Sequence, residues 1–134
     1  MSSPHRIPRT GLPPLVFEGD LLAEASSERH DGPRNSRWQE LALYATTSDR
    51  YAAVVHLITR WHGEGDIIHA QHAATLGELV AFLQGVDPLQ GAFLPPPHNV
   101  RLERQAETIR RTITLAWKDL VGRVLDEAGL EELV

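Results

Sequence analysis

The chain has 134 residues, a length that fits one domain, and its 42% hydrophobic and 23% charged residues are ordinary proportions for a globular protein. It contains no cysteine, which excludes disulfides, thiol catalysis and zinc–thiolate sites. The net charge of −5 is opposite in sign to that of a generic nucleic-acid-binding protein. Because the chain has neither the apolar core of a signal peptide nor a run of the ~20 apolar residues of a membrane helix, we expect a cytoplasmic protein that does not associate with membranes.

The chain begins with a proline-rich stretch. Residues 1–14 contain four of the nine prolines and few apolar residues, so we predict a disordered or loosely docked arm. Residues 15–134 are predicted to form a single α+β domain. Residues 15–23 alternate between apolar and acidic side chains, which predicts a first, half-buried strand with Leu15, Phe17 and Leu21 on one face.

The next strands form an antiparallel meander. Residues 37–46 and 51–62 both alternate, and the tight polar turn at 47–50 between them requires antiparallel pairing. Residues 67–73 have a weaker pattern, which fits either a fourth, shorter strand or a loop. The candidate core anchors in this region are Trp38, Tyr44, Tyr51, Trp61 and Phe82.

Two helices are predicted after the strands. Thr75 and Glu78 have the spacing of a capping box, so a short helix should begin there and run to about Gln84. Residues 99–128 predict a long helix with an apolar stripe made of Leu102, Ala106, Ile109, Ile113, Ala116, Trp117, Leu120 and Val124. We therefore predict an antiparallel three- or four-stranded meander with one short helix and one long C-terminal helix packed on the sheet.

The long helix is predicted to have more surface than one small sheet can cover. It would extend about 45 Å at 1.5 Å per residue. Leu115, Val121 and Leu125 lie outside the apolar stripe and need some other cover. A two-fold copy of the same chain is the commonest solution, so we expect a homodimer or a complex with another protein.

The charges of the long helix support the same expectation. Arginines occupy its N-terminal half, and acids occupy its C-terminal half and the tail, which opposes the helix macrodipole. An antiparallel copy would place basic halves against acidic halves, and the alternative is a solvated helix face with no partner. Arg104, Arg111 and Lys118 also recur every seven residues almost opposite the apolar stripe. This outward basic line could meet phosphates, although a solvated face is the favoured interpretation.

Several histidines are candidate metal ligands. His56 and His62 share a predicted strand face, but six residues of strand place them about 20 Å apart. His62 and His69 could meet across a turn, with Glu64 or Asp66 as a further ligand. We favour surface imidazoles and predict no metal site.

A third of the chain, about residues 37–85, resembles a WGR domain, the module found in poly(ADP-ribose) polymerases and some bacterial proteins. The likeness rests on an aromatic and aliphatic first strand, an Arg-Tyr pair opening the next strand, glycines after it and a capped helix. The residues that carry it are Trp38, Leu41, Leu43, Tyr44, Arg50, Tyr51, Thr59, Arg60, Trp61, Gly63, Gly65, Thr75, Glu78 and Phe82. The resemblance implies a small antiparallel sheet with a helix and assistance in DNA binding, with Trp61 as a stacking residue.

The chain departs from the WGR motif at its defining tripeptide, which here reads Trp61-His62-Gly63 and lacks the arginine. We favour Trp61 as a core anchor over a stacking residue. The leading interpretation of the whole sequence is a small non-catalytic interaction or accessory protein that self-associates and uses no cofactor. The alternatives are a WGR-like nucleic-acid-binding module and a metal-dependent hydrolase that uses His62, His69 and nearby acids.

Overall fold

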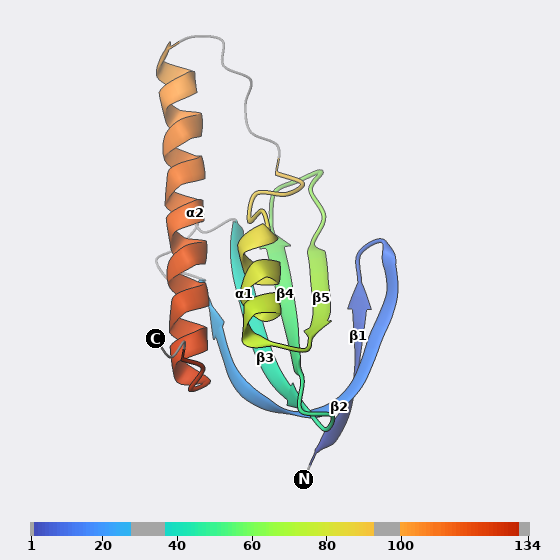
Figure 1. Cartoon of the computed structure of the whole chain (residues 1–134). Coiled ribbons are helices and arrows are strands. Elements are labelled where there is room, and N and C mark those ends of the chain that lie inside the picture. The colour runs from blue at the N-terminus through green and yellow to red at the C-terminus, as the bar shows by residue number, and fades with distance from the viewer. Residues whose placement is uncertain (1, 28–36, 93–99, 132–134) are drawn as a thin grey trace.

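A computed structural model describes residues 2–27, 37–92 and 100–131, and Figure 1 shows their arrangement. The fold is α+β, with a curled antiparallel sheet and two helices. The sheet has five strands in the order β1-β2-β3-β4-β5, one more than the largest number predicted. The strands are β1 Ser3–Arg9, β2 Leu12–Ser26, β3 Arg37–Thr46, β4 Tyr51–Thr59 and β5 Ile67–Ala73. The sequence also predicts a polar loop at 26–36 and a cap for the long helix at Asn99, but residues 28–36 and Asn99 lie outside the described residues.

The fifth strand comes from the N-terminus, where a disordered or loosely docked arm was predicted. That prediction is wrong, because β1 pairs with β2 in a register that aligns Ser3 with Gly19 and Ile7 with Leu15. Prolines lower the strand signal of a sequence because they cannot donate to a ladder. On an edge strand they are tolerated, since one side of the strand needs no partner. β1 is such an edge strand, and this position accommodates Pro4 and Pro8.

A bulge in the long strand β2 changes which of its residues point into the core. Its pairing with β3 shifts between Leu21 and Ala23, which marks a bulge. Leu21 therefore does not join the core and stays 46% exposed, while Ala23 is buried. Just before the bulge, a Cβ at Gly19 would lie 2.4 Å from the main-chain oxygen of Ala45. The close approach of β2 and β3 at this point thus requires glycine.

The rest of the meander follows the sequence prediction closely. Asp49, with a φ of 57°, turns the chain between β3 and β4, which pair antiparallel from Arg37↔Thr59 to Ala45↔Tyr51. β4 ends at Thr59, three residues earlier than predicted. The segment 67–73 is a strand, which resolves the alternative between strand and loop.

Helix α1 (Leu76–Gly85) has the predicted capping box. The Thr75 hydroxyl accepts from the Glu78 amide at 3.1 Å, and the Glu78 carboxylate accepts from the Ala74 amide at 2.8 Å. The two bonds satisfy amide groups that have no partner within the helix. They explain why the helix begins where it does.

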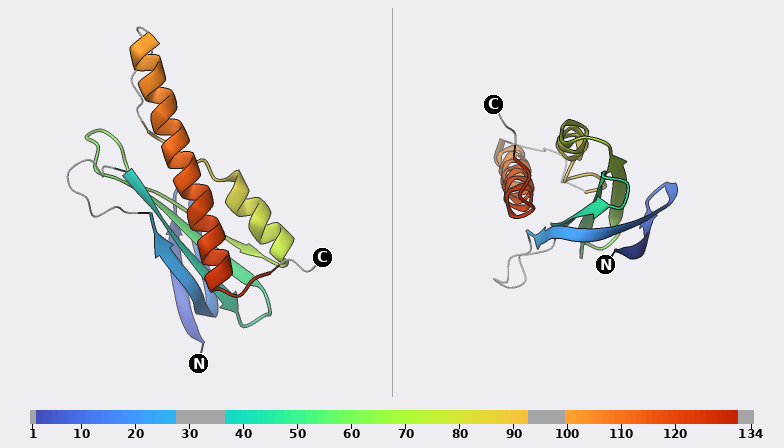
Figure 2. Two further views of the ribbon diagram at one scale, coloured as in Figure 1. Left: turned by 90° about the vertical axis from the view of Figure 1, so that its left-hand side faces the viewer. Right: turned by 60° about the horizontal axis from the view of Figure 1, so that its bottom comes forward.

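Both helices cover one face of the sheet (Figure 2). Helix α2 (Val100–Glu127) contacts β2 and β3, and α1 contacts β4 and β5. The core lies between these helices and the sheet. It consists of Ala23, Leu41, Leu43, Ala53, Val55, Leu57, Ala73, Leu79, Leu83, Trp117, Leu120 and Val124.

The opposite face of the sheet is partly covered by the curl of its own N-terminal hairpin. The Thr10 amide donates to the Ile68 oxygen at 2.9 Å, and the Ile68 amide donates to the Thr10 hydroxyl at 2.9 Å. The Arg9 guanidinium also reaches the Ala70 oxygen at 3.3 Å. The turn after β1 is thereby tied to β5, and Ala52 and Ala70 are buried on this face.

The N-terminal half of α2 projects past the end of the sheet (Figure 1). Its C-terminal half supplies three of its buried residues, Trp117, Leu120 and Val124, while only Ala106 is buried in the projecting half. Val100 at the projecting end is 63% exposed. No helix in the described part of the chain combines the length and apolarity needed to cross a membrane.

Candidate functional site

Two Arg-Trp pairs meet where β3 begins and β4 ends. Because Arg37 pairs with Thr59 in the ladder, Arg37-Trp38 lies beside Arg60-Trp61. The Arg37 guanidinium lies 4.8 Å from the Trp61 ring centroid, and the Arg60 guanidinium lies 4.8 Å from the Trp38 ring centroid. Each arginine therefore stacks on the tryptophan of the other pair.

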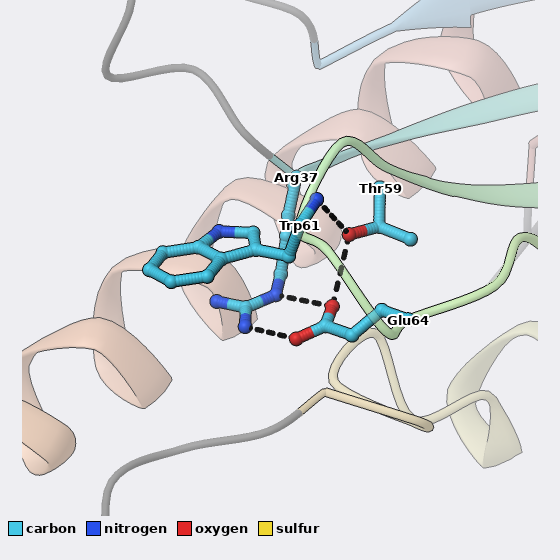
Figure 3. Close-up of polar contacts among 4 residues, drawn as sticks. All are labelled: Arg37, Thr59, Trp61 and Glu64. Carbon is cyan, nitrogen blue, oxygen red and sulfur yellow. Dashed lines mark hydrogen bonds and ion pairs between the residues drawn. The ribbon is translucent and has the colours of Figure 1, made fainter.

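Glu64 fixes Arg37 from below this stack (Figure 3). Its carboxylate accepts from Arg37 Nε at 2.9 Å and from Nη2 at 2.5 Å, and from the Thr59 hydroxyl at 2.9 Å. The Thr59 hydroxyl accepts in turn from the Trp61 amide at 3.1 Å. The side chains of Arg37 and Glu64 are only 11% and 2% exposed, so this is a buried, bidentate ion pair that orders the loop after β4.

Trp61 is not a core anchor, contrary to the sequence prediction, because it is 50% exposed. The strand ends before Trp61, so the alternation that placed it in the core no longer applies. Trp117 is 4% exposed and anchors the core, whereas Trp38, although only 7% exposed, is buried outside that core and under the Arg60 guanidinium. The sequence contained a usable signal for the stacked pairs: the turn at 47–50 sets the register that brings the two Arg-Trp dipeptides together.

The histidines do not form a metal centre within the described residues. His56 contacts Asp66 at 3.1 Å, and His69 contacts the Gln90 side chain at 2.8 Å. His62 and His72 are exposed. The pairing of His62 with His69 that a metal site would require is absent from these contacts of the described residues.

On the other sheet face, an open depression of about 350 Å³ is bordered by Glu24, Glu40 and His56. Glu40 pairs with His56 across the strands, and His56 is already engaged by Asp66. Within the described residues this depression holds no set of three or more side chains that could ligate a metal.

The outward face of α2 contains most of the other residues that the sequence indicated. Arg104, Arg111 and Lys118 are all exposed, and Leu115 between them is 58% exposed. In the described part of the chain, no ion pair involves the three basic residues. These side chains are therefore available to a partner.

Val121 and Leu125 do not belong to that exposed face. Both are partly buried and pack against the core of their own chain. The sequence placed them outside the apolar stripe, but the buried side of α2, which packs on β2 and β3, is wider than predicted. They need no cover from a second molecule, and substitutions there would disturb folding.

No protein-family model, curated protein or solved structure matches the chain.

Proposed function

We propose that this protein is a small, non-catalytic interaction protein that self-associates through the outward face of α2. One observation carries the proposal: this exposed face changes charge along its length. Arg101, Arg104 and Arg111 occupy its N-terminal half, and Asp119 and Asp126 occupy its C-terminal half, where Lys118 is the only base that the sequence placed on this outward line.

Two further features support self-association over a solvated helix face. The charge order is the reverse of the one that stabilises an isolated helix, so each chain carries an unfavourable arrangement that an antiparallel copy would offset. Helix α2 also exposes apolar side chains, including Val100 at its projecting end and Leu115 near its middle. A partner that packs against α2 would cover part of this surface.

The test is the mass of the purified protein in solution. Light scattering and sedimentation equilibrium should give a dimer at ~100 µM, a concentration that detects association free energies of only about −5.5 kcal/mol. Raised salt should weaken the dimer, because exposed ion pairs are screened. A monomer at that concentration would refute the proposal.

The second candidate is a WGR-like nucleic-acid-binding module. The observation in its favour is that Trp61 is 50% exposed, as the aromatic side chain of a base-stacking site would be. Against it, Glu64 neutralises the arginine on which Trp61 stacks. We expect no retention of single- or double-stranded DNA at ~150 mM salt. Tight binding with a steep salt dependence, lost in Trp61→Ala, would reverse the order of the two candidates.

A further inference from the structure

The outward face of α2 has a symmetric pattern centred on Leu115. Seven exposed residues follow one another at steps of four, three, four, four, three and four: Arg104, Thr108, Arg111, Leu115, Asp119, Gly122 and Asp126. At 100° per residue they stay within a stripe about 80° wide. The stripe lies opposite the buried residues Ala106, Trp117 and Val124. We refer to these seven residues as the outer stripe.

The residues of the outer stripe are complementary to the same stripe read in the opposite direction along the helix. Residues at equal distances from Leu115 are Arg111 and Asp119, then Thr108 and Gly122, then Arg104 and Asp126. Each arginine thus corresponds to an aspartate, and the two small residues correspond to each other. We propose, building on the self-association proposed above, that two copies pair α2 antiparallel about a two-fold axis at Leu115.

In this register every member of the outer stripe has a partner from the second copy. The axis brings Leu115 against its own copy, so the most exposed leucine of the helix becomes the centre of the contact. Arg111 and Arg104 each reach an aspartate of the mate, which makes four ion pairs in the dimer. Such an interface is isologous, since the same patch serves both subunits.

Gly122 provides an independent observation for a close helix–helix contact. Glycine in the middle of a helix is unfavourable relative to alanine. Within its own chain no heavy atom lies within 4 Å of the position that a Cβ at Gly122 would occupy, so packing there does not require a glycine. In the proposed dimer Gly122 faces Thr108 of the mate, where the absence of a side chain lets the helices approach. The Thr108 hydroxyl is already bonded to the Arg104 oxygen at 2.9 Å, which leaves its methyl group for the contact.

The first test uses disulfide trapping, which the cysteine-free chain makes unambiguous. Leu115→Cys should form a covalent dimer rapidly under mild oxidation, because only a residue on the axis meets its own copy. Thr108→Cys is the matched control on the same face. Its two copies would lie about 21 Å apart along the helices, beyond the reach of a disulfide. An equal mixture of Thr108→Cys and Gly122→Cys should cross-link to each other.

The second test reverses charges. Arg111→Asp should weaken the dimer at least tenfold, and the double variant Arg111→Asp/Asp119→Arg should restore it. Arg110→Asp is the control, since it makes the same change one residue away on a face that points elsewhere. Circular dichroism should confirm that all three variants keep the helix content of the parent.

The results of these experiments test the proposed register and self-association as two distinct hypotheses. A monomeric parent chain would overturn both proposals. A dimeric parent in which Leu115→Cys cross-links no faster than Thr108→Cys would overturn the register alone. Equal effects of Arg110→Asp and Arg111→Asp, or failure of the double reversal to restore the dimer, would also refute the register and leave self-association standing.

Discussion

The indole N–H of Trp117 donates to the main-chain oxygen of Leu83 at 3.2 Å, a buried hydrogen bond that joins α2 to the last turn of α1. Leu83 itself is completely buried, so this oxygen has no access to bulk water. The two helices are thus connected through one ring that also fills the core.

Substitutions at Trp117 should distinguish its two contributions to stability, the hydrogen bond of the indole N–H and the packing of the ring in the core. Trp117→Phe should lower the free energy of unfolding by about 1–2 kcal/mol through the lost hydrogen bond, and Trp117→Ala by about 3–5 kcal/mol through the added cavity. Trp61→Ala is the exposed control and should cost less than Trp117→Ala. Denaturant unfolding gives all three values, and a Trp61 loss as large as that of Trp117 would contradict the assignment of Trp61 to the surface.

In the buried ion pair between Arg37 and Glu64, neutralising one residue alone should destabilise the fold more than replacing both. Glu64→Gln leaves an arginine that is only 11% exposed without its carboxylate, and should destabilise by about 3 kcal/mol or more. Replacing both residues by leucine should cost less than this single change, because no buried charge is then left unpaired. Thermal unfolding of the single and double variants checks the order, and a double variant that is less stable than Glu64→Gln would contradict it.

Gly122→Ala should have opposite effects on the single chain and on its association. The space around Gly122 is open in its own chain, so alanine should raise the free energy of unfolding by about 0.5–1 kcal/mol. The same methyl group should weaken the dimer by separating the helices. Gly77→Ala in α1 is the matched helical control, and should leave association unchanged. Stabilisation with unaltered association would argue against a close contact at Gly122.

Tyr44 should make the fold sensitive to alkaline pH. Burial, and to a smaller extent the Glu24 carboxylate, raises the pKa of Tyr44 above its ordinary value of 10.0. The unfolded chain therefore ionises first, so the stabilisation from neutral Tyr44 is complete below about pH 10 and is lost as the pH rises through the folded pKa. Unfolding measured from pH 8 to 11 should show a smaller alkaline loss in Tyr44→Phe. Glu24→Gln should reduce the loss only in part, and a parental slope in Tyr44→Phe would contradict the assignment.

The sequence predicted most of the fold because its local signals agreed. The period-two patterns of β3 and β4, the turn at 47–50 and the Thr75 capping box each lead to one answer, and the structure contains all three. The missed strand, β1, is stabilised by pairing and closure with distant segments. The prolines of β1 weaken the local strand pattern of the sequence. The bonds between Thr10 and Ile68, by contrast, join residues 58 positions apart, and a local pattern cannot reveal such contacts.

The candidate site was predictable only in part for a related reason. Exposure of Trp61 depends on β4 ending at Thr59, and that end is set by Asp66, which accepts from the Thr59 amide at 3.0 Å. The burial of Val121 and Leu125 depends on how α2 packs on the core of the sheet. Both are tertiary effects. The outward position of Arg104, Arg111 and Leu115, by contrast, follows from helical periodicity alone.

The closure of the N-terminal turn on β5 has a consequence for how this sheet meets other chains. A free edge strand is a template on which a foreign strand can add, and it invites aggregation. Here Thr10 and Arg9 occupy the backbone groups of Ile68 and Ala70, in the middle of the outermost strand. Strand addition at this part of β5 is therefore blocked. Removal of the first ten residues would expose the edge of β5, where a strand of another molecule could then pair and start aggregation.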